Sequence, residues 1–367
     1  MIYLVLAFTL LNVCFYLFLT ICWSKVPKIS STSTARSFSV IIPVRNEEET
    51  IEKVLTCLEY QQYDKDKYEV LVVNDFSDDS TMDVLSKCLD QFEMNLRVIS
   101  LENHKESGKK YALTRGAEEA KNDFIITTDA DCQMSPNWLS SYASLSADHK
   151  FIAGPVALKG QGFWAELQQA EFSGLIGFGA VTLNNNNPSM CSGANMGFSK
   201  DAFFEVGGYS DNIQIPSGDD EFLLFSIQDR YPKSAAFLKN QSSIVITPVH
   251  KTLRGFANQR IRWTSKWKHN KNPKLRMMAV LFFFDYFFLI ASAFYTLMGS
   301  FSVVILLAVL AIRWLVQVCY VSPVHKFLGL RSAGLPLLVI QIIYPFHILI
   351  MGLNSIFGGY TWKGRKY

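Results

Sequence analysis

The sequence predicts an α/β fold with a mostly parallel sheet, flanked by transmembrane helices. Only 18% of the 367 residues are charged, compared with about 25% in ordinary soluble domains. Apolar residues concentrate in Met1–Ser24, Met277–Val321 and Ser332–Trp362, which hold almost no charged side chains. Between these ends, short β-branched runs alternate with stretches of helical period, as in a series of β-α-β units.

The first apolar segment is long enough to cross a membrane. About 20 residues rising roughly 1.5 Å each span the roughly 30 Å hydrocarbon core, and Leu4–Trp23 has that length. A cleaved signal peptide is the alternative, but its usual basic start is missing and no small-residue cleavage site follows Trp23. We therefore expect an uncleaved anchor over residues 1–24.

Basic residues beside the apolar segments predict the location of the central region. Lys25, Lys28 and Arg36 follow the first segment, and Lys and Arg accumulate without any Asp or Glu between Arg230 and Arg276. By the positive-inside rule, residues 38–276 form a cytoplasmic domain of a multi-pass integral membrane protein, in the plasma membrane if the source is bacterial. The net charge of +3 then reflects residues close to lipid headgroups, and nucleic acid is not an expected partner.

The C-terminal region, residues 277–359, holds about three hydrophobic segments. If all three cross the membrane, the basic tail at residues 360–367 ends outside the cell, against the positive-inside rule. A kink or re-entrant turn at Pro345 would return the tail to the cytoplasm. Asp285 and Arg313 lie inside these segments and are expected to be paired or water-facing, because charges in a membrane are costly. The segments are Met277–Leu297, Gly299–Tyr320 and Gly334–Phe357.

The central region begins with a repeated strand and helix pattern. In a parallel sheet, ligands bind at the carboxyl ends of the strands, so the loops that begin at Pro43, Asn74, Ser100 and Thr128 are expected to share one crevice. The predicted strands are Phe38–Pro43, Glu69–Asn74, Leu96–Ser100 and Asp123–Thr128, and the predicted helices are Glu47–Gln61, Thr81–Glu93 and Lys110–Ala120. Further along, Gln161–Leu183 has the mixed composition of an interfacial helix, with buried core packing as the alternative.

Two carboxylates follow a predicted buried strand directly. Asp129 and Asp131 can together hold a hard divalent cation, Mg²⁺ or Mn²⁺, which typically bridges a carboxylate to substrate phosphates. Two Asp residues in a turn are common without a metal, so the prediction depends on the position at the end of the strand. Seven cysteines without a CxxC pair and six scattered histidines give no zinc pattern.

Other polar residues belong to the neighbouring loops. Asp75 ends a strand, where a carboxylate can accept from a nucleobase N–H or a ribose hydroxyl, and an Asx turn or helix N-cap is the alternative. Lys109, after Ser107 and Gly108, offers a compact cation suited to a diphosphate, or belongs to a solvated charge run.

Two later segments complete the candidate chemistry. In Gly218–Glu221, three adjacent acids precede a helix; one of them can act as a general base for an acceptor hydroxyl, or all can complement the helix dipole. Gln259, Arg262 and Trp263 share one face of a predicted helix, where they could meet a diphosphate and an acceptor ring. A basic amphipathic helix on the membrane surface is the alternative.

In this order and spacing, the motifs resemble those of the membrane-bound family 2 glycosyltransferases, which include cellulose and hyaluronan synthases and ceramide glucosyltransferases. The resemblance covers roughly Phe38–Lys268 and the arrangement of membrane segments. The segments that carry it are Val40–Glu47, Asn74–Asp75, Ser107–Lys109, Asp129–Asp131, Ser192–Asn195, Gly218–Asp220 and Gln259–Trp263.

The resemblance implies a GT-A fold and an inverting, metal-dependent hexosyltransferase that uses a nucleotide-diphosphate sugar, with a UDP-sugar as the expected donor. It assigns Asp220 as the catalytic base, Asp129 to nucleotide and metal, and Asp131 to the metal. Ser192–Asn195 matches the acceptor side. The remaining substrate-binding positions that it implies are Pro43, Arg45 and Glu47 in the first loop, Asp75 at the base, Lys109 at the phosphates, and Gln259, Arg262 and Trp263 at the diphosphate and acceptor channel.

One anchor and about three C-terminal segments are few helices for a polysaccharide channel. We therefore expect transfer to a lipid or lipid-linked acceptor at the cytoplasmic face, with a processive synthase subunit of the cellulose or hyaluronan synthase type as the alternative. A non-enzymatic scaffold is disfavoured because Asp131, Asp220 and Arg262 are all present. A nucleotidyltransferase would not require the Gln259–Trp263 segment.

Overall fold

The computed structural model describes residues 2–30, 36–145, 147–266, 272–357, 361–362 and 365–366. The chain divides into two compact units. Residues 26–159 and 178–248 form a unit built on a β-sheet, which we call the α/β unit. Residues 1–25, 160–177 and 249–367 form a mostly helical unit, which we call the helical unit.

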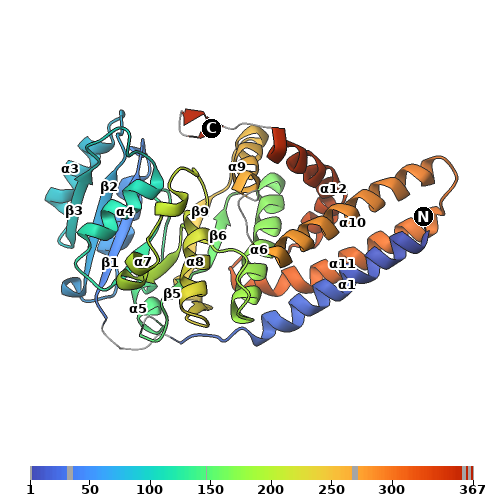
Figure 1. The fold of residues 1–367 in the computed structure, drawn as a ribbon, viewed down its shortest axis with the longest axis horizontal. Coiled ribbons are helices and arrows are strands. Elements are labelled where there is room, and N and C mark those ends of the chain that lie inside the picture. Colours follow the sequence, from blue (N-terminus) through green and yellow to red (C-terminus); the bar gives the residue numbers. More distant parts are fainter. Residues whose placement is uncertain are drawn as a thin grey trace. The chain divides into compact units, whose positions relative to one another are not determined.

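The α/β unit contains a seven-stranded sheet with the order β3-β2-β1-β4-β7-β5-β8 (Figure 1). Strands β1 to β4 are parallel, and β1 pairs with β2 from Phe38 opposite Tyr68 to Val44 opposite Asn74. The predicted α/β class with a mostly parallel sheet is confirmed. The strands are β1 (Phe38–Val44), β2 (Tyr68–Asn74), β3 (Asn95–Ser100), β4 (Phe124–Thr127), β5 (Phe151–Ala153), β7 (Met196–Ser199) and β8 (Ala235–Phe237).

Strand β7 departs from the parallel arrangement and was not predicted. It runs antiparallel to both β4 and β5. Gly197 lies in its centre, and a Cβ at this position would stand 2.7 Å from the Phe124 ring and 2.8 Å from the Tyr142 ring. A second, two-stranded parallel sheet joins β6 (Val156–Lys159) to β9 (Val245–Pro248).

Helices connect the strands where the periodicity predicts them. The helix expected from Glu47 begins instead at Ile51, because the Glu47 carbonyl accepts from the Thr50 and Ile51 backbone N–H groups in a tight turn. The helices of the α/β unit are α2 (Ile51–Glu59), α3 (Thr81–Gln91), α4 (Lys109–Glu119), α5 (Trp138–Ala143), α7 (Lys200–Glu205) and α8 (Asp219–Arg230), with short 3₁₀ turns at Lys65–Lys67, Ser210–Asn212 and Gln241–Ser243.

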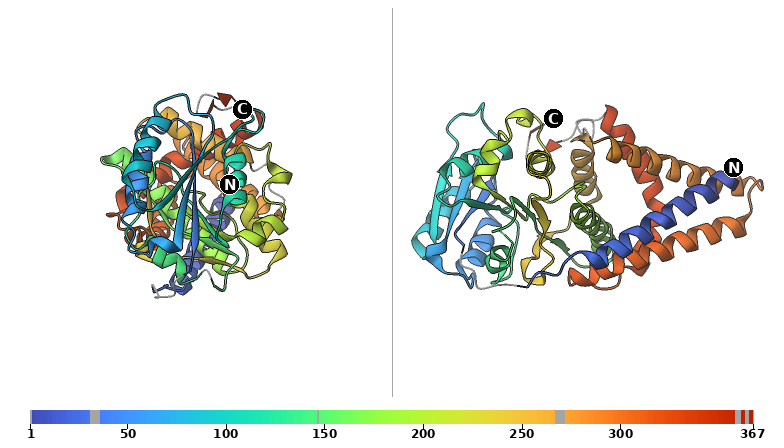
Figure 2. Two further views of the ribbon diagram at one scale, coloured as in Figure 1. Left: turned by 90° about the vertical axis from the view of Figure 1, so that its left-hand side faces the viewer. Right: turned by 60° about the horizontal axis from the view of Figure 1, so that its bottom comes forward.

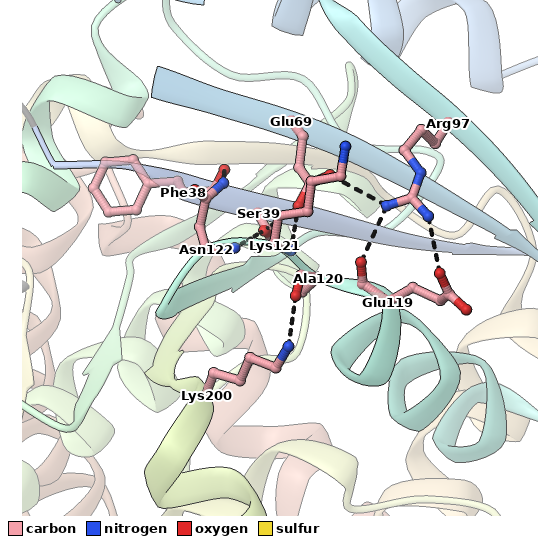
Figure 3. A network of polar contacts seen from close by, with 9 residues as sticks. All are labelled: Phe38, Ser39, Glu69, Arg97, Glu119, Ala120, Lys121, Asn122 and Lys200. Atoms are coloured by element: carbon pink, nitrogen blue, oxygen red, sulfur yellow. Dashed lines mark hydrogen bonds and ion pairs between the residues drawn. The ribbon is translucent and has the colours of Figure 1, made fainter. Parts of the chain in front are cut away.

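The amino ends of the parallel strands are tied by a polar network (Figure 3). Buried Glu69 accepts from the Ser39 hydroxyl and the Lys121 backbone N–H, both at 2.6 Å. Arg97 lies 3.4 Å from Glu69 and 2.9 Å from Glu119. Because ligands bind at the carboxyl ends of such strands, this network stabilises the opposite edge of the sheet and has no place in the candidate site.

Among the described residues of the helical unit, three helices are long and apolar enough to cross a membrane: α1 (Ile2–Lys25), α10 (Pro273–Leu297) and α11 (Val303–Phe327). Helix α1 packs against α10 and α11, and Figure 2 shows the three from a second direction. The remaining elements are α9 (Leu253–Ser265), α12 (Gly334–Phe357), the first part of α6 (Phe163–Asn184), and the hairpin strands β10 (Thr361–Trp362) and β11 (Arg365–Lys366).

Asp285 and Arg313 pair with each other inside the apolar helices, as expected. Two hydrogen bonds of 2.7 and 2.6 Å join the guanidinium to the carboxylate, and the Asn12 amide donates to the same carboxylate at 3.3 Å. Both charged side chains are almost fully buried. This cluster links α1, α10 and α11.

One other expectation, a re-entrant turn in the C-terminal region, needs correction. Pro345 lies inside the continuous helix α12, so the chain makes no re-entrant turn there. The α/β unit ends at Pro248, and the domain expected from the sequence over residues 38–276 stays a prediction. Helix α6 is buried along most of its length, which favours core packing over an interfacial position. The basic tail at residues 360–367 lies outside the described residues apart from β10 and β11.

Candidate active site

The loops at the carboxyl ends of the parallel strands meet one another. The Arg45 guanidinium, after β1, donates to the Asp75 backbone carbonyl, after β2, at 2.8 Å. The Asp75 carboxylate accepts from the Gly108 backbone N–H at 3.0 Å. The expected convergence of these loops is therefore present, with buried Asp75 connecting its two neighbours.

The first two loops are further fixed by an amide. Asn46 has a left-handed backbone with φ of 55°, and its side chain exchanges two hydrogen bonds with the backbone and carboxylate of Asp78. Glu47 accepts from the Thr50 hydroxyl at 2.6 Å, so this contact stabilises the turn before α2. Pro43 lies within β1 itself, opposite Val73.

Lys109 joins the third loop to the fourth. Its ammonium lies 2.7 Å from an Asp129 carboxylate oxygen and 3.1 Å from one of Asp219. Burial alone would lower the pKa of Lys109, but the carboxylates of Asp129 and Asp219 outweigh it and hold the pKa well above its usual range. Lys109 is therefore a permanent positive charge at this edge of the sheet.

Asp220 lies in the first turn of α8, immediately after Gly218, whose backbone is left-handed with φ of 82°. One carboxylate oxygen accepts from the Gly193 backbone N–H at 3.2 Å, and the other accepts from the Glu221 backbone N–H at 2.8 Å. These two hydrogen bonds fix both oxygens of the carboxylate. Asp220 thus has a defined orientation suited to accepting a proton.

Gly193 and Asp219 are site residues that sequence reasoning did not select. A Cβ on Gly193 would stand 2.7 Å from an Asp219 oxygen and 3.1 Å from the Lys109 ammonium, so any side chain there would displace these two groups. The Thr127 hydroxyl donates to the Gly193 carbonyl at 3.1 Å and fixes this backbone beside β4. Both residues occur in the motifs noted above, but nothing in the sequence shows that they meet.

The segment Ser192–Asn195, expected on the acceptor side, divides in function. Gly193 contacts the candidate site, whereas Asn195 is fully buried in a hydrogen-bonded cluster. The Asn195 amide oxygen accepts from Trp138 at 3.0 Å and Tyr142 at 2.8 Å, and its nitrogen donates to two backbone carbonyls. Asn195 therefore stabilises the fold and is not exposed to an acceptor.

Asp129 and Asp131 provide carboxylates for a cation, although in different surroundings. Asp129 is paired with Lys109, and Asp131 lies 3.5 Å from the Thr247 hydroxyl. Across the described ranges, no three His, Cys, Asp or Glu side chains gather closely enough to hold a metal ion by themselves. Two carboxylates fit Mg²⁺ or Mn²⁺ when phosphate oxygens and water complete the ligand set, which is the usual arrangement for Mg²⁺.

Gln259, Arg262 and Trp263 belong to α9 in the helical unit, whereas the loop residues above belong to the α/β unit. The Gln259 side-chain amide oxygen accepts from the Arg260 guanidinium at 2.7 Å, and the Trp263 ring lies 6.1 Å from that of Phe172. The predicted helix is confirmed, and its spacing places the three residues on one face.

The α/β unit is thus of the class that binds ligands at the carboxyl edge of a parallel sheet, with a lysine, carboxylates and a helix-start acid gathered there. The profile of Glycosyl transferase family group 2 matches residues 124–360, and that of Glycosyl transferase family 2 matches residues 39–207. The chain belongs to the family 2 glycosyltransferases.

Similar proteins agree with this assignment. Glycosyltransferase AglE of Haloferax volcanii is 37% identical over 108 residues, which are 29% of this chain and 34% of that protein. Probable glycosyltransferase YdaM of Bacillus subtilis is 37% identical over 93 residues, which are 25% of this chain and 22% of that protein. The alignments thus span about a third or less of these two relatives.

A solved structure shares the fold over nearly the whole chain. The mannosyltransferase PcManGT of Pyrobaculum calidifontis, solved with GDP-Man and Mn²⁺, has a TM-score of 0.65 and 20% identity, covering 93% of this chain and 98% of its own. Its likeness confirms the GT-A fold.

Proposed function

We propose that the protein is an inverting, metal-dependent hexosyltransferase that moves a sugar from a nucleotide-diphosphate sugar to a lipid or lipid-linked acceptor at the cytoplasmic membrane face. The observation that carries the proposal is the position of Asp220. It is held by two backbone N–H groups beside the Lys109 pair, at the carboxyl edge of the sheet.

The donor half of the proposal rests on the joined loops. Asp75 and Arg45 would hold the nucleoside, with a UDP-sugar as the expected donor, and Lys109 would face the diphosphate. Asp129 and Asp131 would hold Mg²⁺ or Mn²⁺. Such a cation neutralises charge on a leaving diphosphate when bound. In the similar mannosyltransferase structure, Mn²⁺ accompanies the nucleotide sugar.

The reaction follows from these positions. The Asp220 carboxylate removes the proton of the acceptor hydroxyl, and the acceptor oxygen forms a bond to the anomeric carbon. The bond from that carbon to the diphosphate breaks on the opposite face, so the configuration inverts. A positioned base contributes roughly 10²- to 10⁴-fold in rate. The Lys109 ammonium stabilises the leaving nucleoside diphosphate in the transition state.

The roles of Gln259, Arg262 and Trp263 at the diphosphate and acceptor rest on the motif alone. Their helical spacing places an amide, a guanidinium and an indole on one face of α9.

The lipid acceptor is supported by the helices and by the relatives. In the part of the chain that the structure describes, three helices are long and apolar enough to cross a membrane. A 27% identical relative from Serratia proteamaculans is an undecaprenyl-phosphate 4-deoxy-4-formamido-L-arabinose transferase. Another of the same identity, from Trichormus variabilis, is a beta-monoglucosyldiacylglycerol synthase. We therefore place a multi-pass protein in the membrane, with its α/β unit in the cytoplasm.

The test is nucleoside diphosphate release by detergent-solubilised protein across a panel of sugar nucleotides, with Mg²⁺, Mn²⁺ or EDTA, and with or without membrane lipid extract. We expect metal-dependent release that requires lipid, and a product carrying one sugar with inverted configuration by NMR. A long saccharide product would support the processive alternative. No release with any donor would contradict the proposed function.

A further inference from the structure

Arg260 is the buried arginine of the segment from Gln259 to Trp263. Its side chain is only 6% exposed, and its partner Glu171, on α6, is 8% exposed. Two hydrogen bonds join them, from Nε to Oε1 at 3.1 Å and from Nη2 to Oε2 at 2.6 Å. This two-point contact fixes the plane of the guanidinium.

The same guanidinium contacts two residues of the motif. Its Nη1 donates to Oε1 of the Gln259 side-chain amide at 2.7 Å. Its carbon lies 4.3 Å from the centre of the Trp263 ring and 4.5 Å from that of Phe256, distances typical of cation–π contacts. The Arg260 guanidinium therefore donates hydrogen bonds to Glu171 and Gln259. It also lies within cation–π distance of two aromatic rings.

The ion pair with Glu171 also gives Arg260 a different role from the one proposed for Arg262. Glu171 neutralises Arg260, and three nitrogens of this guanidinium already donate to protein oxygens. Because Arg260 is buried and paired with Glu171, it is poorly suited to binding a diphosphate. We expect it instead to orient the side chains of Gln259 and Trp263.

We propose that Arg260, oriented by Glu171, is a positioning residue that fixes the Gln259 amide and the Trp263 indole in their working orientation. The inference concerns contacts within the helical unit, and its catalytic consequence rests on the proposed function. The Tyr344 hydroxyl, 3.5 Å from the same Glu171 oxygen that accepts from Nε, connects α12 to this pair.

The first readout does not require activity. Protein labelled with 5-fluorotryptophan gives ¹⁹F resonances, and the Trp263→Phe variant assigns that of Trp263. We expect Arg260→Lys and Glu171→Gln each to shift the Trp263 resonance, because a lysine cannot reproduce the planar fork. Arg254→Lys, an exposed position on the same helix, is the matched control and leaves the resonance in place.

The second readout is kinetic. In Arg260→Lys and Glu171→Gln, we expect kcat to fall by roughly 10²-fold, as misplacement of positioning groups can cause, with a smaller change in the donor KM. Thermal unfolding of both variants establishes that they are folded. An unmoved Trp263 resonance in both folded variants would overturn the proposal. If the wild-type protein shows no transfer activity, the proposed function is overturned. The ¹⁹F measurement then still tests whether Arg260 fixes the Trp263 side chain.

Discussion

At the scale of single residues, the candidate site depends on close approach between charges and backbone. Lys109 lies between Asp129 and Asp219, and the Gly193 backbone passes beside it while its N–H binds Asp220. Because one glycine contacts both sides of this arrangement, a small change there should disturb the lysine pair and the proposed base together.

We predict that Gly193→Ala lowers kcat by roughly 10²-fold while the protein stays folded. The new methyl would stand 2.7 Å from Asp219 and 3.1 Å from Lys109, so these side chains must move. Steady-state kinetics and thermal unfolding measure the two effects. Gly174→Ala is the control, since its methyl would meet only Val321, at an ordinary 3.7 Å. Wild-type kcat in Gly193→Ala would contradict the geometry of the site.

At the scale of elements, α4 carries basic residues in contrasting surroundings, of which Lys109 and Arg115 make the clearest comparison. Lys109, at its start, lies between the carboxylates of Asp129 and Asp219, with its own side chain 16% exposed. Arg115, two turns later, pairs with Glu118 and Glu119 on the exposed face. Ion pairs of these two kinds differ in their effect on stability, because removing one partner of a buried pair leaves an uncompensated charge.

We predict that Lys109→Met destabilises the folded protein by about 1–3 kcal/mol, because Asp219, only 9% exposed, loses its charged partner, whereas Asp129, 37% exposed, stays in contact with solvent. The matched variant Arg115→Met should cost less than about 1 kcal/mol, as exposed pairs do. Chemical unfolding followed by fluorescence measures both. Equal losses would show that Lys109 is solvated and not held between the carboxylates.

The buried Asp285–Arg313 ion pair is expected to affect the stability of the apolar helices. We predict that Arg313→Leu alone destabilises the detergent-solubilised protein strongly, by about 3–5 kcal/mol, because Asp285 would remain buried and unpaired. Removing both charges in Asp285→Leu/Arg313→Leu should recover much of the loss. Thermal unfolding in one detergent compares the variants. A double variant that unfolds at a lower temperature than the single variant would contradict this account.

Sequence periodicity predicted the strands and helices of the first half of the α/β unit, where the local hydrophobic pattern is regular. Strands β1, β2 and β4 are short, nearly continuous apolar runs, and the helices between them follow the helical period. Strand β7 escaped prediction because four residues with a central glycine give no such pattern. The end of the α/β unit at Pro248 has no local pattern either, because it depends on contacts such as Glu171 with Arg260, 89 positions apart.

For the site, the residue types in the loops were predictable but their partnerships were not. The sequence indicated that Asp75, Lys109 and Asp129 follow neighbouring strands. It did not indicate that Asp219 would pair with Lys109, because these residues are far apart in the chain and Asp219 is one of three adjacent acids. Arg260 was passed over for the same reason, since its burial depends on a glutamate on another helix.

At the scale of the whole molecule, the chain combines a GT-A sheet unit with a helical unit whose long helices could cross a membrane. The proposed chemistry takes place at the carboxyl edge of the sheet. The helical unit contributes the Gln259–Trp263 segment and the proposed link to a lipid acceptor. The central claim is that Asp220 is the base for glycosyl transfer.

The most direct test is lipid-dependent nucleoside diphosphate release by Asp220→Asn, compared with wild type and with Asp211→Asn, an exposed acid in the preceding 3₁₀ turn. We predict that Asp220→Asn loses roughly 10²- to 10⁴-fold in kcat while it binds the donor with unchanged affinity. Asp211→Asn should match wild type. Wild-type kcat in Asp220→Asn would contradict the proposed mechanism.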